Sequence, residues 1–427
     1  MERRGWLRPE VLLPGTFLLA IVVGAGLLLL PPMHHGGVGP TEAIFTATSA
    51  VCVTGLAVVD TGTEWTLAGQ IVLLVLIQLG GIGIMTFGVL ALVLVGKRVG
   101  LAHEAAVRDI YTSVMNWRIG QLLAVVLFTT LVCEGAGYVA LRLAGEPHWP
   151  ALFHSISAFC NAGFSVNSDS LQGAGPAVRL VIIALLIVGG LGFVTLIEIG
   201  RNLRLRKNGA RRFSLHARMV FTSSLVLLGI GTLAYAALED WDIGNAFFMS
   251  ASTRTAGFDT VPVGGLRATT LLILMPLMFI GASPGSTGGG IKTTTAAVVW
   301  LAARRMLVGG TEVRLHARRI SDVVVRRAFA VLFFSIGVVL VTIFLLHLLE
   351  GDRPEKLLAY SFEAVSACAT VGLSMGITAE LTTASKFVLC AAMFIGRVGS
   401  LSIFILLVLR ESPVSRVRYP EERVLVG

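Results

Sequence analysis

Long apolar segments alternate with short polar segments along the whole chain. Apolar runs of about 20 residues are long enough to cross a bilayer as helices. They predict spanning helices over 11–30, 65–95, 119–143, 177–199, 217–237, 269–304, 328–349 and 384–409. Shorter apolar segments, too short to span, lie inside successive pairs of these runs, over 41–50, 150–159, 243–252 and 355–367.

Each short segment leads into a similar motif that starts with small residues and ends in Gly followed by Leu or Phe. The copies occupy 49–56, 157–164, 251–258 and 366–373, and their glycines lie 108, 94 and 115 residues apart. A fixed repeat of this kind determines the fold class. We therefore expect an all-α membrane protein of four pseudo-symmetric helix–pore loop–helix repeats, with eight transmembrane helices around one central pore. The repeats are 1–98, 99–202, 203–310 and 311–427, the last with a short cytoplasmic tail.

Composition and charge agree with this prediction. The 427 residues are 55% hydrophobic and only 14% charged, and their mean hydropathy is +0.82. The net charge of +9 does not indicate nucleic-acid binding, because most Lys and Arg fall in the segments that join the predicted repeats, such as 201–218 and 304–327. Under the positive-inside rule these loops and both termini are cytoplasmic in a multi-pass protein of the cell membrane. The motifs then open outward, where acidic residues are more frequent.

The glycine motifs suit the binding of a dehydrated cation. Irregular backbone at membrane depth is tolerated where protein surrounds it or where it lines a wet cavity. Glycine permits backbone angles closed to other residues and lets backbone carbonyls face inward. Four such loops on one axis would present rings of carbonyl oxygens that replace the hydration shell of potassium. The carboxyl ends of the short helices would add partial negative charge there.

These motifs and their flanking helices resemble the Trk/Ktr/HKT superfamily of potassium transporters over almost the whole chain, most closely the KtrB-type ion-translocating subunit. The resemblance implies a potassium selectivity filter whose ion-binding residues are Val53, Thr54, Gly55, Asn161, Ala162, Gly163, Thr255, Ala256, Gly257, Thr370, Val371 and Gly372. It implies potassium preference at Gly55, because serine in the first position accompanies sodium permeation in that family.

The resemblance also implies potassium uptake by a homodimer that sits on a cytosolic ring of nucleotide-binding, RCK-type regulatory subunits. No covalently bound cofactor is expected. Relatives of this type are often sodium-dependent symporters, and the sequence leaves open whether sodium or protons are coupled here.

The run over 269–304 is broken in its middle by a stretch of small residues: Gly281, Ser283, Pro284, Gly285, Ser286, Thr287, Gly288, Gly289 and Gly290. Pro and repeated Gly do not hold a helix in mid-membrane. The family carries a gating loop here, which obstructs the pore when closed; a static kink is the alternative. A phosphate-binding loop is discounted, because Lys292 comes one place too late and no strand precedes it.

Arg397 lies in the middle of the last predicted helix, where a guanidinium is costly and should face the pore or a partner. The family carries an arginine near the gating loop, so we expect Arg397 to hold the closed loop through its carbonyls. A purely structural bond to one acid or carbonyl is the alternative. Lys292 has three interpretations: it belongs to the gate, it caps the broken helix, or its side chain extends inward along that helix.

Weaker candidates are read as structural. Glu134 and Glu198 are intramembrane acids that could bind sodium or protons, but helix–helix hydrogen bonds or solvation at helix ends are favoured. Arg254 is expected to bind an outer acid or carbonyl, outside the ion path. An enzyme is not expected, because clustered titratable or metal-binding groups are missing from the sequence pattern. Two rivals remain: a cation-coupled secondary transporter with a broken-helix site at the midplane, and a cation channel that works alone.

Overall fold

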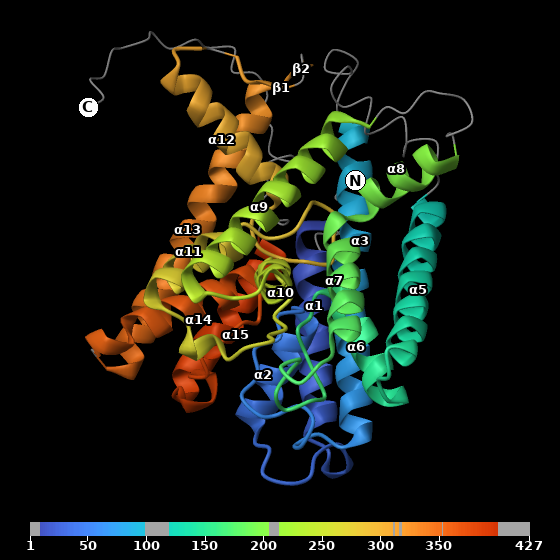
Figure 1. Ribbon diagram of the computed structural model, residues 1–427, viewed down its shortest axis with the longest axis vertical. Coiled ribbons are helices and arrows are strands. Elements are labelled where there is room, and N and C mark those ends of the chain that lie inside the picture. Colours follow the sequence, from blue (N-terminus) through green and yellow to red (C-terminus); the bar gives the residue numbers. More distant parts are fainter. Residues whose placement is uncertain are drawn as a thin grey trace, which may run out of the picture.

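The computed structural model describes residues 9–98, 119–204, 213–310, 312–315, 318–351 and 353–399. The regular secondary structure of these residues is helical apart from one small hairpin, and loops join the helices. The long helices run roughly side by side, and four short helices lie among them (Figure 1). The short helices are α2 (Pro40–Val51), α6 (His148–Cys160), α10 (Ile243–Thr253) and α14 (Leu357–Ala369).

Each short helix packs against the helices that flank it in the chain. Helix α2 contacts α1 (Pro9–Leu28) and α3 (Leu67–Arg98), and α6 contacts α5 (Ile119–Leu143) and α7 (Pro176–Leu191). Helix α10 lies along α9 (Leu215–Glu239) and touches α11 (Ala268–Phe279). Helix α14 contacts α13 (Asp322–Glu350), α15 (Thr383–Phe394) and the π-helical turn η8 (Ile395–Gly399).

The remaining described elements lie at the ends of the bundle. Helices α8 (Phe193–Arg204) and α12 (Thr293–Leu307) lie at the end drawn uppermost in Figure 1, with the antiparallel strands β1 (Arg314–Leu315) and β2 (Arg318–Arg319). Short 3-10 turns complete the list: η2 (Pro31–Met33), η5 (Val263–Gly265), η6 (Pro354–Lys356) and η7 (Thr378–Glu380).

Local sequence explains several helix starts. The side chain of Asp242 accepts a hydrogen bond from the Asn245 amide at the beginning of α10, and Ser214 does the same for Ala217 at the beginning of α9. Short polar side chains at this position satisfy amides that have no partner within the helix. The four short helices can therefore begin in polar loops and then be buried along most of their length.

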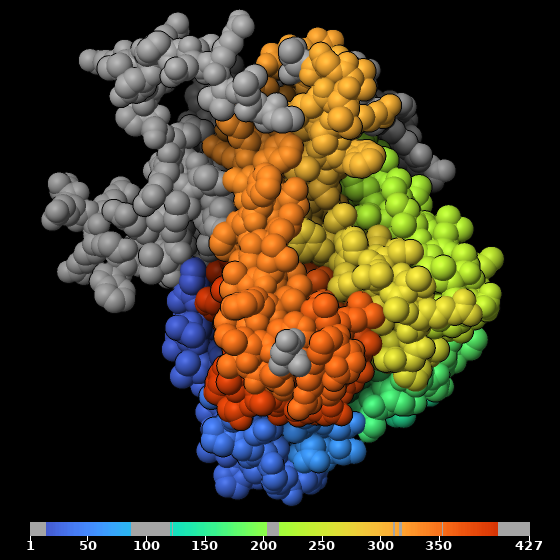
Figure 2. Space-filling view, turned by 90° about the vertical axis from the view of Figure 1, so that its left-hand side faces the viewer, coloured from blue at the N-terminus to red at the C-terminus, as the bar shows by residue number. Residues whose placement is uncertain are grey.

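The outer surface is apolar, as expected of helices that face lipid. Within the described residues, four helical segments are long and apolar enough to cross a membrane: Leu67–Thr86 of α3, Leu123–Leu143 of α5, α9 and α13; the bent pair of α7 and α8 passes the same test when taken together. Helix α13 forms an orange ridge down one face in Figure 2, and its Phe333, Leu340 and Phe344 are exposed. Length and composition of the described residues therefore support four of the eight expected spans, or five if the bent pair counts as one.

The predicted helices differ from the observed ones at one place and agree with them at another. The prediction of one continuous helix over 177–199 is wrong: it breaks at Gly192, and the axes of α7 and α8 differ by 101°. The predicted break within 269–304 is confirmed, because α11 ends at Phe279 and α12 begins at Thr293. The last predicted helix is described as far as residue 399, and its remainder lies outside the described residues.

Candidate functional site

The four motif glycines lie against one another in a closed ring. A Cβ atom built on Gly55 would come within 3.1 Å of the Cα of Gly163, and one on Gly163 within 2.9 Å of the Cα of Gly257. The corresponding distances are 3.2 Å from Gly257 to Gly372 and 3.1 Å from Gly372 back to Gly55. Each would also strike the carbonyl oxygen of the residue that precedes the next glycine. Four backbones therefore approach one axis, and a side chain is excluded at each position.

The segments on this ring share one unusual backbone path. We call Val53–Gly55, Asn161–Gly163, Thr255–Gly257 and Thr370–Gly372 the filter segments. Each begins with a non-glycine residue at positive φ, which is 55° at Val53, 57° at Asn161, 80° at Thr255 and 49° at Thr370. Such residues are uncommon and store strain when the surroundings impose them. A non-glycine residue at positive φ recurs at the same position in all four segments. This recurrence indicates that the backbone path is a specific feature of the site.

Polar oxygens in these segments lack partners. The hydroxyls of Thr54, Thr255 and Thr370 are buried without a hydrogen-bond partner among the described residues. A buried polar atom of this kind calls for an explanation, such as a bound ion or water. Hydroxyl and carbonyl oxygens are ligands that suit hard cations. The ring therefore presents unpaired oxygens of the kind that bind hard cations.

A serine in each short helix ties the helix to its filter segment. Ser49 accepts a hydrogen bond of 3.1 Å from the amide of Gly55, and Ser366 accepts one of 3.1 Å from Gly372. Ser157 instead donates to the carbonyl of Phe164 at 2.8 Å. These bonds fix the distance between the end of the short helix and the ring.

The third copy of the motif is one residue shorter than the others. Here Ser252 donates to the carbonyl of Phe258, as Ser157 does in the second copy. With the four glycines aligned, Ala251 stands at the serine position of the other copies. The serine of the third copy is therefore displaced by one residue, while Thr255 and Gly257 stay in register. Arg254 stands at the resulting bend, with φ −85° and ψ 53°.

Buried side chains also anchor the loops that leave the filter, and the sequence analysis missed them. Glu363 of α14 accepts hydrogen bonds from the Ser374 hydroxyl, from the Met375 amide at 3.1 Å and from the Thr378 hydroxyl at 3.1 Å. His154 of α6 lies 3.0 Å from the hydroxyl of Ser165. Both anchors stand nine residues before the ring glycine of their own motif. This shared position is the sequence signal from which the two anchors could have been found.

The irregular segment 280–292, which we call the intramembrane loop, packs directly against the filter segments. A Cβ on Gly288 would strike the hydroxyl of Thr255, and one on Gly289 would strike that of Thr370. Thr287 of the loop donates to the Phe159 carbonyl at 3.0 Å and accepts from the Asn161 side chain at 2.9 Å. The loop therefore contacts the second, third and fourth filter segments or the helix ends beside them.

Arg397 joins this loop to the bundle. Its side chain is 2% exposed, and it donates to the Thr287 carbonyl at 2.6 Å and to the Gly80 carbonyl of α3 at 3.3 Å. Lys292 adds bonds from its Nζ to the carbonyls of Gly288 at 2.7 Å and Gly289 at 3.4 Å. Two cationic side chains therefore bind backbone oxygens of the loop.

Comparison with known proteins identifies the family. The family described as TrkH, cation transport protein, matches residues 19–416. The chain belongs to the TrkH family of cation transport proteins. It is 38% identical to the Ktr system potassium uptake protein B of Bacillus subtilis (strain 168), over 99% of this chain and 98% of that protein. It is 37% identical to the protein of the same description from Vibrio alginolyticus, over 96% and 93%.

The fold of this TrkH-family chain is also that of a solved relative. The crystal structure of the potassium transporter TrkH from Vibrio parahaemolyticus aligns with a TM-score of 0.76 at 20% identity, over 96% of this chain and 86% of that one. Family membership and the apolar helices make this a multi-pass membrane protein. The family is one of transporters, not of enzymes.

The charged residues that were weaker site candidates in this TrkH-family chain form hydrogen bonds with neighbouring helices. Glu134 accepts a hydrogen bond of 2.9 Å from Gln78 of α3, and Glu198 of α8 accepts two from Ser214 at the start of α9. Both are helix–helix contacts, as expected. Arg254 donates to the hydroxyl of Ser224 at 3.2 Å and to its carbonyl at 3.4 Å, so it is bound to a residue within α9. The described residues contain no cluster of three or more His, Cys, Asp or Glu that could hold a metal ion.

One acid beside the ring is poorly solvated. Asp259 lies two residues after Gly257, in the loop that leaves the third filter segment. One of its carboxylate oxygens is buried without a hydrogen-bond partner. Burial raises the pKa of Asp259 to about 6, although hydrogen bonds from Ser170 and Gln172 act in the opposite direction. Its charge therefore changes near neutral pH.

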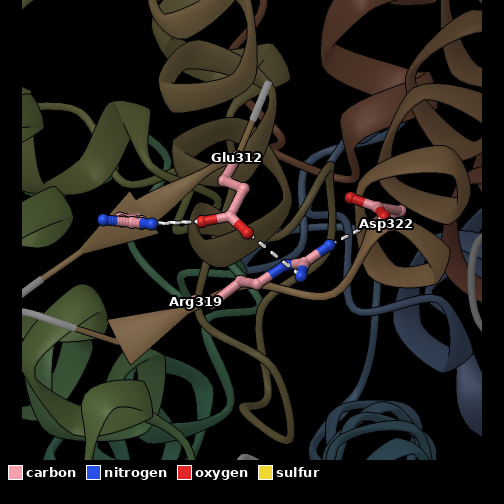
Figure 3. Close-up of polar contacts among 4 residues, drawn as sticks. Glu312, Arg319 and Asp322 are labelled. Carbon is pink, nitrogen blue, oxygen red and sulfur yellow. Dashed lines mark hydrogen bonds and ion pairs between the residues drawn. The ribbon is translucent and has the colours of Figure 1, made fainter. Parts of the chain in front are cut away.

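At the opposite end of the bundle, a charged cluster holds the hairpin to α13. Glu312 lies between Arg314 and Arg319, and Arg319 also meets Asp322 at 3.2 Å (Figure 3). The hydrogen bond from Arg314, and then the positive charges of both arginines, lower the pKa of Glu312. Exposed ion pairs contribute little stability. The cluster orients the strands and is remote from the ring.

Proposed function

We propose that this chain is the ion-translocating subunit of a Ktr-type potassium uptake system in the cytoplasmic membrane. The observation that carries the proposal is the closed ring of Gly55, Gly163, Gly257 and Gly372, bordered by three unpaired threonine hydroxyls. The printed descriptions of the relatives from Bacillus subtilis and Vibrio alginolyticus name potassium uptake. Ring and relatives together favour potassium as the cargo.

The proposed architecture has four repeats and eight spans around this ring. The repeats are 1–98, 99–202, 203–310 and 311–427, and each contributes one short helix and one filter segment. The recurrence of a short buried helix between two other helices supports this division. Both termini and the basic loops between repeats are cytoplasmic in this arrangement.

The filter segments would replace the hydration shell of the ion with backbone carbonyl oxygens. The close approach of the four backbones supports this role, because it brings successive carbonyls next to the ring. The hydroxyls of Thr54, Thr255 and Thr370 provide additional oxygens. Glycine at position 55 keeps the first segment free of a side chain and favours potassium over sodium.

The intramembrane loop would be the gate, drawn here in its closed position. The gate would comprise Gly281, Ser283–Gly290 and Lys292. The contacts of Gly288 and Gly289 with the filter segments, and the bond from Arg397 to the Thr287 carbonyl, support this role. Since the recorded acceptors of Arg397 are neutral carbonyls, its positive charge also opposes the entry of a cation at this level. Ion flow then requires the loop to leave.

The assembly would be a homodimer on an RCK-type nucleotide-binding ring. The basic residues of the segments around α8, α12 and the hairpin offer a docking surface for such a ring. The following experiment also tests whether potassium uptake depends on sodium.

The test is growth of a potassium-uptake-deficient bacterium at low external potassium. The chain is expressed with its own regulatory partner, with and without sodium, beside a Gly55→Val variant as the inactive control. We expect growth with the wild-type chain only. Failure of the stably expressed wild type in both media would refute potassium uptake, and growth in sodium medium alone would establish sodium dependence.

A further inference from the structure

The break between α7 and α8 is not encoded by a proline. Residues 177–199 form an unbroken apolar run without proline, which is why the sequence predicts one helix there. In the structure α7 ends at Leu191, Gly192 takes φ 81° and ψ 147°, and α8 leaves at 101°. This backbone region is essentially open to glycine alone. Gly189, Gly190 and Gly192 weaken the helix at this point, and groups outside the segment stabilise the break.

The intramembrane loop supplies the missing backbone partners. The amides of Ser283 and Thr287 donate to the carbonyls of Gly190 and Gly189 at the end of α7, at 3.1 Å and 3.3 Å. The carbonyl of Gly285 accepts from the amide of Phe193, the first residue of α8, at 3.1 Å. Without the loop, these groups would lie unpaired at membrane depth, where each lost bond is costly.

The two segments also fit each other sterically. A Cβ on Gly192 would strike the carbonyl oxygen of Pro284 and lie 3.2 Å from the carbonyl carbon of Gly285. Conversely, a Cβ on Gly285, which has φ 70°, would lie 2.7 Å from the ring of Phe193. The glycines at 192 and 285 thus allow the loop to sit inside the break.

A continuous helix would satisfy the same groups internally. In an α-helix each amide donates to the carbonyl four residues earlier. The Phe193 amide would then pair with the Gly189 carbonyl, and these are two of the groups that the loop now occupies. Bonding to the loop and bonding across Gly192 are therefore mutually exclusive.

We propose that the intramembrane loop and the α7–α8 break form one two-state unit. When the loop leaves the pathway, α7 and α8 join into a single helix, and Gly192 is the residue that positions the closed loop. This inference rests on the proposed gate and deepens it. Since α8 is held at Ser214 of α9 through Glu198, joining the helices also moves or releases that contact.

The test measures the angle of the break directly. Spin labels are placed by cysteine substitution at Leu180 of α7 and Arg201 of α8, which are both exposed. The five native cysteines are unpaired, and a chain without the added cysteines gives their background. Helix rise predicts a label separation of about 20 Å across the 101° bend and about 32 Å in a continuous helix.

Two variants should shift the label distances toward the longer value. Gly192→Ala excludes the closed backbone conformation, and Arg397→Ala releases the loop; each should raise the long-distance population about tenfold. Gly200→Ala is the matched control, because it is the same substitution in α8 and a Cβ there meets nothing within 4 Å. The control should keep the wild-type distances.

The outcomes separate this inference from the proposed gate. Potassium flux into proteoliposomes is measured on the same variants. If Arg397→Ala raises flux while the label distance stays near 20 Å, the gate stands and the coupling is refuted. If the distance lengthens but flux is unchanged, the two-state unit stands and its role as a gate is refuted. Unchanged distances in both variants also refute the coupling.

Discussion

Arg397 donates a 2.6 Å hydrogen bond to the carbonyl of Thr287, a residue 110 positions earlier in the chain. The same guanidinium reaches the carbonyl of Gly80, so one side chain connects α3, the intramembrane loop and the π-helical turn η8. Its Nε has no hydrogen-bond partner among the described residues. A buried cation held by neutral carbonyls is energetically costly. This cost indicates that the position of the intramembrane loop matters for function.

Replacing Arg397 should open the pathway. Arg397→Ala removes the charge-assisted bond to the Thr287 carbonyl, worth about 1.5–3 kcal/mol to the closed loop, and with it the connection of the loop to Gly80 of α3. A shift of about 1.4 kcal/mol is already tenfold. We therefore expect potassium flux in proteoliposomes to rise at least tenfold. The flux of Arg397→Lys should lie between those of the wild type and Arg397→Ala. Unchanged flux in a normally expressed Arg397→Ala chain would assign the residue a structural role only.

The hydroxyl of Thr287 should stabilise the closed loop independently of Arg397. Thr287→Val keeps the shape of the side chain but removes its bonds to the Phe159 carbonyl and Asn161. At about 1 kcal/mol for each lost bond, flux should rise roughly five- to thirty-fold. The control is Thr232→Val in α9, whose hydroxyl bonds only within its own helix turn. Equal flux in both variants would contradict the closed-loop assignment.

Gly55→Ser should weaken discrimination between potassium and sodium. A Cβ at this position lies 2.5 Å from the Ala162 carbonyl, so the ring must shift and its oxygens no longer fit the larger ion. Gly26→Ser in α1 is the matched control, because a Cβ there meets nothing within 4 Å. The measurement is the ratio of potassium to sodium uptake. A ratio that stays at the wild-type value would show that Gly55 does not line the ion path.

Removing the Glu363 carboxylate should destabilise the protein more than a surface substitution. Glu363→Ala leaves the hydroxyls of Ser374 and Thr378 and the amide of Met375 without their acceptor. We expect a loss of about 3–5 kcal/mol, measured as a lowered unfolding temperature in detergent. Glu363→Gln keeps one acceptor oxygen and should lose less. An unchanged melting temperature for the alanine variant would contradict this.

Uptake should fall as the external pH is lowered through about 6. Burial raises the pKa of Asp259 to about 6, so the carboxylate is charged above this value and neutral below it. Loss of a negative charge beside the ring lowers the local concentration of cations. Initial potassium uptake at subsaturating potassium should decrease a few-fold from pH 7.5 to pH 5. In Asp259→Asn it should be low and independent of pH over that range; a retained pH profile would exclude Asp259.

The sequence was sufficient to identify a helical membrane transporter and to locate its four glycine motifs. Helix length against bilayer thickness, the net excess of Lys and Arg between repeats and the recurring glycines are local properties of the chain. They predicted the four short helices, the break within 269–304 and Arg397 as a residue that must find a partner. Each of these depends on composition or on a few neighbouring residues.

Other features depend on contacts between distant residues, and only the tertiary structure decided them. The displaced serine of the third motif became visible through the bond from Ser252 to Phe258. The anchors at Glu363 and His154 became visible through loops that fold back over the short helices.

The break at Gly192 is the clearest case. Its own apolar run predicts a continuous helix, and the broken form is stabilised by amides and a carbonyl about 100 residues later in the chain. The closed ring follows the same principle: each glycine is an ordinary turn residue by itself, and four backbones within van der Waals contact make it a site.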